Sequence, residues 1–350
     1  MKGATGMALN ETAHRPAAMR KASETEVSDP GASRSEAEFQ RAAFDGCWHD
    51  LPMPGQGSTL ERWQALRSWG AGDLSSAKLL ESHADALAIL AEADRPARPG
   101  ELYAVWASSL GGGLTCRRAG TGVVVTGDLR FASAARWVDR ALLVARDELD
   151  RVLLLDIDLH ESRITPDPDS WKAVGMLATD SVTLRFDDVP VDVECVVETD
   201  GWYLSRPGFW IGAIGVAAVW AGAIDGMVGT LREALAREPA PSPHRLAHLG
   251  ACAAHRHTVD VLLSDAAAIV DRHPLANHQR LATLVRTGVE AAAQDVLTRT
   301  HRALGAAPLG HDAEHARRMA DLPVYLRQHH AERDLEWLGR ATVANETGSP

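Results

Sequence analysis

The sequence predicts an α+β protein in which helical segments flank a central β domain. Three observations support this fold class. Apolar residues recur at intervals of three and four over 58–93 and again over 208–339, and short β-rich runs fill the stretch from 102 to 197. We therefore expect N-terminal helices, a middle antiparallel β domain and a C-terminal four-helix bundle. The predicted segments are a tail at 1–44, a truncated N-terminal helical domain at 45–100, the β domain at 101–200 and the bundle at 201–345.

The first segment and the helices after it differ sharply in composition. Residues 1–44 are rich in Ala, Ser, Glu, Thr and Gly and hold almost no large apolar side chains. Such a segment cannot bury enough apolar surface to offset the entropy of ordering, so we predict a disordered tail. Helical spacing begins at Leu60 and continues to Leu90. The stretch Arg95-Pro-Ala-Arg-Pro-Gly100 ends it, because two prolines and a glycine oppose a helix.

The β domain is predicted from short runs of β-branched and aromatic residues. Gly and Asp pairs separate these runs, which is typical of antiparallel strands joined by turns. The predicted strands lie at 103–106, 122–126, 141–144, 151–155 and 182–186.

The C-terminal region returns to helical spacing. It is broken at Pro239–Pro243, at His273-Pro274 and near Gly305–Gly310, which predicts a bundle of about four long helices. One stretch, 209–228, is about long enough to cross a bilayer. Because it contains Asp225 and many small residues, we interpret it as a helix buried inside the bundle and expect no membrane association.

Composition and charge exclude several classes of function. The chain has 47 acidic and 36 basic residues, a formal net charge of −11, and no Lys/Arg block that would follow a phosphate backbone, so nucleic acid is not an expected partner. No apolar run follows the basic residues at the amino terminus, as a signal peptide requires. The four cysteines are widely spaced, which disfavours a disulfide framework and fits a cytoplasmic protein: Cys47, Cys116, Cys195 and Cys252.

Two blocks of the β domain carry a resemblance to a known family. The first is Gly127-Asp-Leu-Arg-Phe131-Ala-Ser133, followed by an apolar strand, and the second runs from Trp171 through Gly175-Met to Phe186-Asp-Asp-Val. Together with the order of helices, β domain and bundle, they resemble the acyl-CoA dehydrogenase superfamily of flavoproteins. The likeness extends over about 58–340 and is weakest in the N-terminal helices, which look shortened.

The resemblance implies a noncovalently bound FAD. Phe131 and Ser133 match positions that contact the flavin in the family, whereas Arg237 and Arg302 match positions near the dinucleotide, although the Phe-Gly pair expected after Arg237 is missing. The strand that enters the flavin site carries Ser108 and then Gly111-Gly112-Gly113 in place of the usual Thr-Glu-Pro. These glycines fit either close approach of the backbone to a phosphate or a flexible hairpin. No Gly-x-Gly-x-x-Gly fingerprint supports a nicotinamide site.

The catalytic base of the resembled dehydrogenases is replaced here. That base is a glutamate eight residues after the Asp of an Arg-x-x-Arg-Asp-Ala helix, and counting eight from Asp321 reaches His329. Two explanations compete. His329 or its neighbour His330 acts as the base, since imidazole titrates near neutrality, or the pair lies on a solvated helix of a degenerate relative.

A further pattern, His311-Asp-Ala-Glu314-His315, fits the H-x-x-E-H sequence of some zinc proteases. Two histidines one helical turn apart can bind zinc, but no third ligand is evident nearby. We therefore expect no metal site.

The resemblance leaves three functions open. The first is an FAD-dependent oxidoreductase that oxidises an acyl thioester, such as an acyl-CoA, at its α–β bond, with an electron-transfer flavoprotein as partner. The second is a monooxygenase of the same fold that takes reduced flavin from a flavin reductase. The third is a noncatalytic flavin-binding or assembly relative, as the missing glutamate and the shortened N-terminal region suggest. The resemblance also implies a homodimer or homotetramer, because a neighbouring subunit completes the FAD site in this family.

Overall fold

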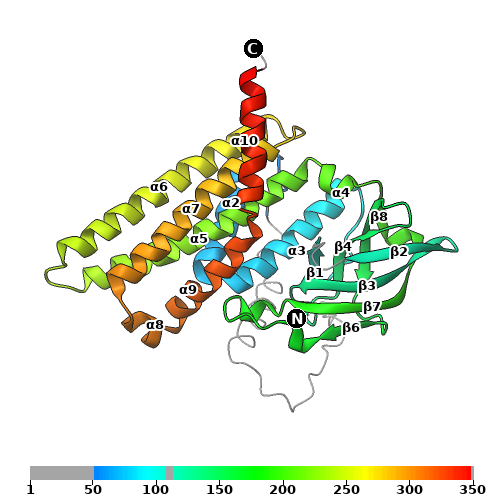
Figure 1. Ribbon diagram of the computed structural model, residues 1–350, viewed down its shortest axis with the longest axis horizontal. Coiled ribbons are helices and arrows are strands. Elements are labelled where there is room, and N and C mark those ends of the chain that lie inside the picture. Colours follow the sequence, from blue (N-terminus) through cyan, green and yellow to red (C-terminus); the bar gives the residue numbers. More distant parts are fainter. Residues whose placement is uncertain (1–50, 108–112, 348–350) are drawn as a thin grey trace, which may run out of the picture.

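The computed structural model describes residues 51–107 and 113–347. The predicted tail at 1–44 and the candidate flavin contact Ser108 lie outside the described residues. Within them, Figure 1 shows a helical bundle on one side, a β domain on the other and helix α3 between the two. The predicted α+β fold class is confirmed.

In the described part of the chain two helices precede the sheet, as predicted from the spacing over 58–93. Helix α2 spans Thr59–Gly72 and α3 spans Leu74–Glu92. They meet at Asp73, whose carboxylate accepts a hydrogen bond from the Ser76 backbone N–H at 2.8 Å. This carboxylate caps the free N–H groups at the start of α3, which fixes the turn between the two helices.

Within the residues that the structure describes, the β domain is a single eight-stranded sheet. Its order is β6-β7-β3-β2-β4-β5-β8, with β1 also paired to β4. The sheet is mixed rather than purely antiparallel, because β1 and β2 both run parallel to β4. A parallel pair needs a long connection, and β1 reaches β4 only after β2 and β3 intervene in the chain. The strands are β1 (Tyr103–Trp106), β2 (Leu114–Ala119), β3 (Gly122–Ala132), β4 (Arg140–Arg146), β5 (Val152–Asp158), β6 (Ile164–Asp167), β7 (Val182–Val191) and β8 (Val196–Glu198).

The bundle is assembled from both ends of the chain. Helices α5 and α6 pack on each other, on α7 and on α2. The fourth helix of the bundle, α2, therefore comes from the N-terminal helices rather than from the C-terminal region. Helices α9 and α10 are shorter and lie at its edge, where α10 projects from the molecule (Figure 1). The helices are α4 (Trp202–Ser205), α5 (Gly208–Ala236), α6 (Pro243–Arg272), α7 (Gln279–Leu304), α8 (Ala307–His311), α9 (Ala313–Tyr325) and α10 (Glu332–Thr347).

Helix α5 forms the centre of the bundle. It is long and apolar enough to cross a membrane, but 72% of its most apolar window is buried inside the protein. Leu231, Ile224 and Trp220 on this helix are completely buried. The apolar character of α5 is therefore accounted for by packing against other helices.

Candidate functional site

Phe131 stands at the end of β3 in a conformation that non-glycine residues rarely adopt. Its φ is 64°, and 48% of the residue is exposed. The ring packs edge-on against Trp171, with 6.3 Å between the ring centroids. A strained backbone that keeps an aromatic ring partly exposed is a common feature of binding sites.

Ser133 begins a buried chain of hydroxyl groups. Its Oγ lies 2.7 Å from Ser181 Oγ, which lies 2.7 Å from Thr179 Oγ1. Thr179 donates its proton to the backbone carbonyl of Met176 at 2.8 Å. Because each hydroxyl has a single proton, Ser181 must then donate to Thr179, and Ser133 to Ser181. Ser133 Oγ is thereby left with acceptor capacity only.

The segment that ends this chain is anchored by α3 and α9. Asp321 on α9 accepts a hydrogen bond from the Met176 backbone N–H and another from Ser75 Oγ on α3. Burial raises the pKa of Asp321 to about 6. Gly175 presses against the Ala320 backbone so closely that a Cβ atom would overlap it. The position of the hydroxyl chain is thus tied to both helices.

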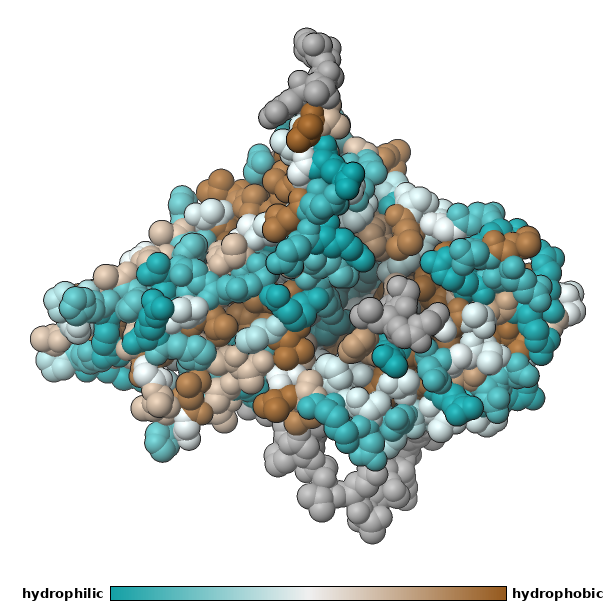
Figure 2. All heavy atoms as spheres, viewed as in Figure 1, coloured by the Kyte–Doolittle hydropathy of each residue, from teal (hydrophilic) through white to brown (hydrophobic). Residues whose placement is uncertain are grey.

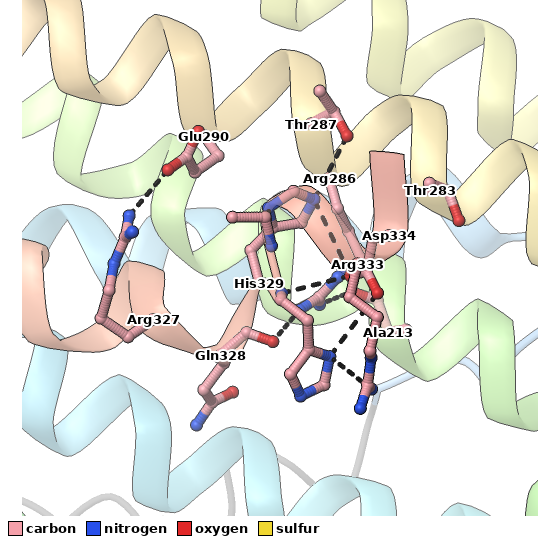
Figure 3. Close-up of polar contacts among 12 residues, drawn as sticks. Ala213, Thr283, Arg286, Thr287, Glu290, Arg327, Gln328, His329, Arg333 and Asp334 are labelled. Atoms are coloured by element: carbon pink, nitrogen blue, oxygen red, sulfur yellow. Dashed lines mark hydrogen bonds and ion pairs between the residues drawn. The ribbon is translucent and has the colours of Figure 1, made fainter. Parts of the chain in front are cut away.

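His329, the predicted base, is buried between α7 and α10 (Figure 3). Its Nδ1 accepts a hydrogen bond from the Ala331 backbone N–H at 3.2 Å, and its Nε2 lies 3.2 Å from Thr287 Oγ1. The first contact places the ring proton on Nε2. Burial and the nearby Arg286 lower the pKa of His329, so the imidazole is neutral at pH 7. Both ring nitrogens are engaged within the protein.

His330 lies in a different environment. Its side chain is 56% exposed, and its Nδ1 lies 3.1 Å from an Arg333 nitrogen. This residue matches the description of a solvated surface histidine. The catalytic roles assigned to His329 and His330 stay predictions.

Four further residues form a buried polar cluster beside His329, which we call the inner cluster. It consists of Glu81 on α3, Trp220 on α5, Arg286 on α7 and Tyr325 on α9. Arg286 lies 4.7 Å from the centre of the Trp220 ring and donates to the carbonyl of Gln328, the residue before His329 (Figure 3). Burial raises the pKa of Glu81 to about 7.

A cleft of about 660 Å³ opens at the other end of α9. His315 is buried beside it, and neither ring nitrogen of His315 has a hydrogen-bond partner in the described part of the chain. Burial lowers the pKa of this imidazole. Three arginines, Arg237, Arg245 and Arg318, line the cleft together with three carboxylates, so donors for an anionic group stand beside groups that repel it; the carboxylates are Glu233, Asp312 and Glu314.

The H-x-x-E-H pattern falls in the same place. Its residues His311, Glu314 and His315 all line the cleft. Among residues 51–107 and 113–347, however, no three His, Cys, Asp or Glu side chains are arranged to hold a metal ion.

Comparisons with known proteins identify the architecture. No family model and no curated protein sequence matches the chain. Solved structures do match. Methanesulfinate monooxygenase MsuC from Pseudomonas fluorescens is 20% identical with a TM-score of 0.73, covering 93% of this chain and 99% of that one. A probable acyl CoA dehydrogenase from Mycobacterium abscessus is 16% identical with a TM-score of 0.71, covering 86% and 90%.

The chain has the acyl-CoA dehydrogenase fold. A third neighbour, XiaF from Streptomyces sp. in complex with FADH2 and glycerol, is 20% identical with a TM-score of 0.72, covering 90% of this chain and 91% of that one. The acyl-CoA dehydrogenase fold is the one that the two blocks of the β domain indicated in the sequence.

The structure separates the sequence-predicted site residues into groups. Phe131 and Ser133 lie together at the end of β3, and Arg237 lines the cleft. Arg302 is exposed on α7 and is not among the residues that line the cleft.

Sequence reasoning missed the inner cluster and the partners of Ser133. A signal existed for Glu81, since it is a carboxylate next to Leu79 and Leu80 in an apolar stretch of helix. The sequence carries no comparable signal at Arg286 or at Ser181.

Proposed function

We propose that this protein is a flavin-dependent oxidoreductase that works as a monooxygenase supplied with reduced flavin. One structural neighbour is a monooxygenase and another holds FADH2, which supports a flavin cofactor for this fold. When bound, a reduced flavin supplies the two electrons that activate molecular oxygen.

The residues of this chain fit a flavin dinucleotide. Phe131 and Trp171 offer aromatic surface for the ring system, and Ser133 offers a hydrogen-bonding group for its edge. The cleft offers arginines that can contact phosphates, alongside three carboxylates. The buried His315 nitrogens have no hydrogen-bond partner within residues 51–107 and 113–347, so they need a ligand or water.

The direction of the hydroxyl chain is the observation that carries the proposal. With Thr179 donating to the Met176 carbonyl, the single proton of each hydroxyl makes Ser133 the donor to Ser181, so Ser133 can only accept a further hydrogen bond. The N5 atom of a reduced flavin carries a proton, whereas N5 of an oxidised flavin has only a lone pair. An acceptor at Ser133 therefore complements the reduced form, and an additional bond from Ser133 to oxidised N5 would require the chain to reverse.

His329 supports the same choice. A dehydrogenase needs a base to remove the substrate's α proton. Here the residue at the matching position is a neutral imidazole whose two nitrogens already contact Ala331 and Thr287. With Nδ1 accepting from Ala331 and the Nε2 proton directed at Thr287, the ring has no free lone pair for proton abstraction from carbon.

Anaerobic flavin titrations test the proposal. We expect reduced FAD to bind about tenfold more tightly than oxidised FAD, the difference expected from one hydrogen bond near the upper end of the usual range. Ser181→Ala removes the acceptor of the Ser133 proton, so Ser133 can donate to N5 of oxidised FAD. The difference between the affinities for reduced and oxidised FAD should then become smaller. Ser82→Ala is the matched control, because Ser82 is equally buried but its hydroxyl accepts from the Val105 backbone N–H. Oxidised FAD that binds as tightly as reduced FAD, giving a yellow purified protein, would contradict the proposal.

A second candidate is oxidation of an acyl thioester, which the sequence resemblance implies. The specific observation in its favour is Glu81, whose pKa of about 7 suits a general base. Anaerobic addition of an acyl-CoA to the FAD-bound protein distinguishes the two candidates. Bleaching of the oxidised flavin, lost in Glu81→Gln, would support the dehydrogenase, with an electron-transfer flavoprotein rather than a flavin reductase as partner.

A further inference from the structure

Arg286 is a buried cation whose described partners are neutral. Only 8% of the residue is exposed, and its two terminal nitrogens donate to the backbone carbonyls of Ala213 and Gln328 at 2.7 and 2.8 Å. Among the described residues no carboxylate pairs with it directly, since Asp334 and Glu81 act on its charge only at longer range. Burying a charge without an ionic partner is costly, so such a group is a candidate for binding an anion.

Two unused hydrogen-bond donors lie beside Arg286. Trp220 Nε1 and the Tyr325 hydroxyl are both buried, and neither has a hydrogen-bond partner within residues 51–107 and 113–347. The two rings meet edge-on with 6.1 Å between their centroids, and the Arg286 guanidinium lies over the Trp220 ring. An indole N–H can only donate, and a guanidinium has five N–H groups, of which two are used here. The inner cluster is therefore rich in donors and poor in acceptors.

Glu81 is the one carboxylate in the cluster. Only 7% of it is exposed, and Arg286, Arg62, Lys78 and Asp85 all act on its charge. When an anion enters, repulsion favours the protonated carboxyl, which then becomes a fourth donor. Glu81 thus weakens anion binding while ionised and contributes to it while protonated.

The inner cluster lies close to the segment that holds the hydroxyl chain. Ser75 on α3 and Asp321 on α9 both contact Met176. Glu81 follows Ser75 by six residues and Tyr325 follows Asp321 by four, distances of about 9 and 6 Å along a helix at 1.5 Å per residue. A substrate group held by the cluster would therefore lie within about one small molecule's length of the flavin-binding face.

We propose that the inner cluster binds the oxyanion of a small substrate, a carboxylate or an oxidised sulfur acid, through Arg286, Trp220 and Tyr325. This inference rests on the proposed function, because it assigns the substrate class of the same site. It also disfavours a long acyl chain in this space, which would leave a buried guanidinium against hydrocarbon.

Calorimetric titration of the full-length protein with and without FAD tests the proposal. The probes are two matched pairs, benzoate with benzamide and methanesulfonate with dimethyl sulfone, which differ mainly in charge. We expect at least one anion to bind about tenfold more tightly than its neutral counterpart, as a charge-assisted hydrogen bond provides. The member that binds identifies whether the site prefers a carboxylate or a sulfur acid.

Three substitutions test the contributions of individual inner-cluster residues to anion binding. Tyr325→Phe removes one hydroxyl and should weaken anion binding about fivefold, and Arg286→Lys should weaken it at least as much because the planar fork is lost. Glu81→Gln should tighten it at pH 8, since the like charge is gone. Tyr103→Phe is the matched control, because that hydroxyl accepts from the Arg98 backbone N–H in the β domain, and its anion affinity should equal that of the wild type.

Two outcomes separate this inference from the proposed function. If FAD binds while benzoate and methanesulfonate bind no better than their neutral counterparts, or if Tyr325→Phe leaves anion affinity unchanged, the oxyanion site is wrong and the flavin function stands. If the anions bind selectively to a protein that takes up no flavin, the oxyanion site stands and the proposed function is wrong.

Discussion

Glu81 places a carboxyl group in the interface between α3 and the bundle, and burial makes its contribution to stability depend on pH. Its pKa is raised from 4.5 to about 7, chiefly by desolvation and against the opposing effect of Lys78. Arg62, Asp85 and Arg286 are the other charged groups that act on it. In the unfolded chain the same carboxyl loses its proton near pH 4.5, so between pH 4.5 and 7 the folded protein binds more protons than the unfolded one.

The sign of the effect follows from this difference. Stability contributed by protonated Glu81 is fully present below pH 4.5 and is lost as the pH rises through 7. Glu81→Gln should therefore match the wild type near pH 4.5 and exceed its free energy of unfolding at pH 8 by about 3 kcal/mol, the equivalent of the pKa shift. Urea unfolding at the two pH values measures this, with the exposed Glu336→Gln as control. A Glu81→Gln curve parallel to that of the wild type across this range would show that the carboxyl is not desolvated.

At the level of single residues, the sequence indicates some candidate site residues and gives no sign of others. Phe131 and Ser133 could be proposed because they belong to a contiguous block with a recognisable order. Arg286 and Glu81 could not be brought together, because helical spacing shows that a residue lies on one face of its helix but not which helix that face meets. The orientation of Ser133 depends on Ser181, 48 residues later, and so needs the folded structure.

Helices α2 and α5 cross at a contact that only glycine allows. A Cβ atom on Gly70 would overlap the Val219 carbonyl, and one on Gly222 would overlap the Arg67 carbonyl. The two glycines therefore let the backbones approach closely, and this crossing joins the N-terminal helices to the bundle.

Gly222→Ala tests the importance of this crossing. The added methyl group must push the helices apart, which we expect to destabilise the protein by about 1–3 kcal/mol, as overpacking usually does. Gly250→Ala in α6 is the matched control, because open space surrounds that position and alanine should stabilise the helix by about 0.5–1 kcal/mol. The measurement is the urea midpoint of each variant, and an increase for both would show that the crossing tolerates a side chain.

The strands that the sequence predicts are the more apolar ones. The five predicted runs coincide with β1, β3, β4, β5 and β7. Strand β2 was missed because Arg117 and Arg118 interrupt its apolar alternation, and β6 because Pro166 lies within it, while β8 has only three residues. The parallel pairing of β1 and β2 with β4 was missed because residue type in a short strand does not reveal the direction of its neighbour.

The molecule as a whole presents two regions that suit different parts of one cofactor. The β-domain face around Phe131 offers aromatic surface, whereas the cleft between α5, α8 and α9 offers arginines. The surface in Figure 2 is largely hydrophilic along α10, which projects from the bundle with Leu335 and Val343 exposed. We propose, from the sequence resemblance, that a second copy of the chain completes the cofactor site in a homodimer or homotetramer.

FAD and FMN differ only in the adenylate half, so comparing them isolates the cleft. If the cleft holds the adenylate part, Arg237→Ala should lower FAD affinity about tenfold, the loss of one charge-assisted hydrogen bond, and leave FMN affinity unchanged. Arg232→Ala, five residues earlier on α5 and not among the residues that line the cleft, is the matched control. Arg302→Ala tests the position that only the resemblance assigns. An equal loss of FMN and FAD affinity in Arg237→Ala, with an unchanged oligomer by light scattering, would place the dinucleotide elsewhere.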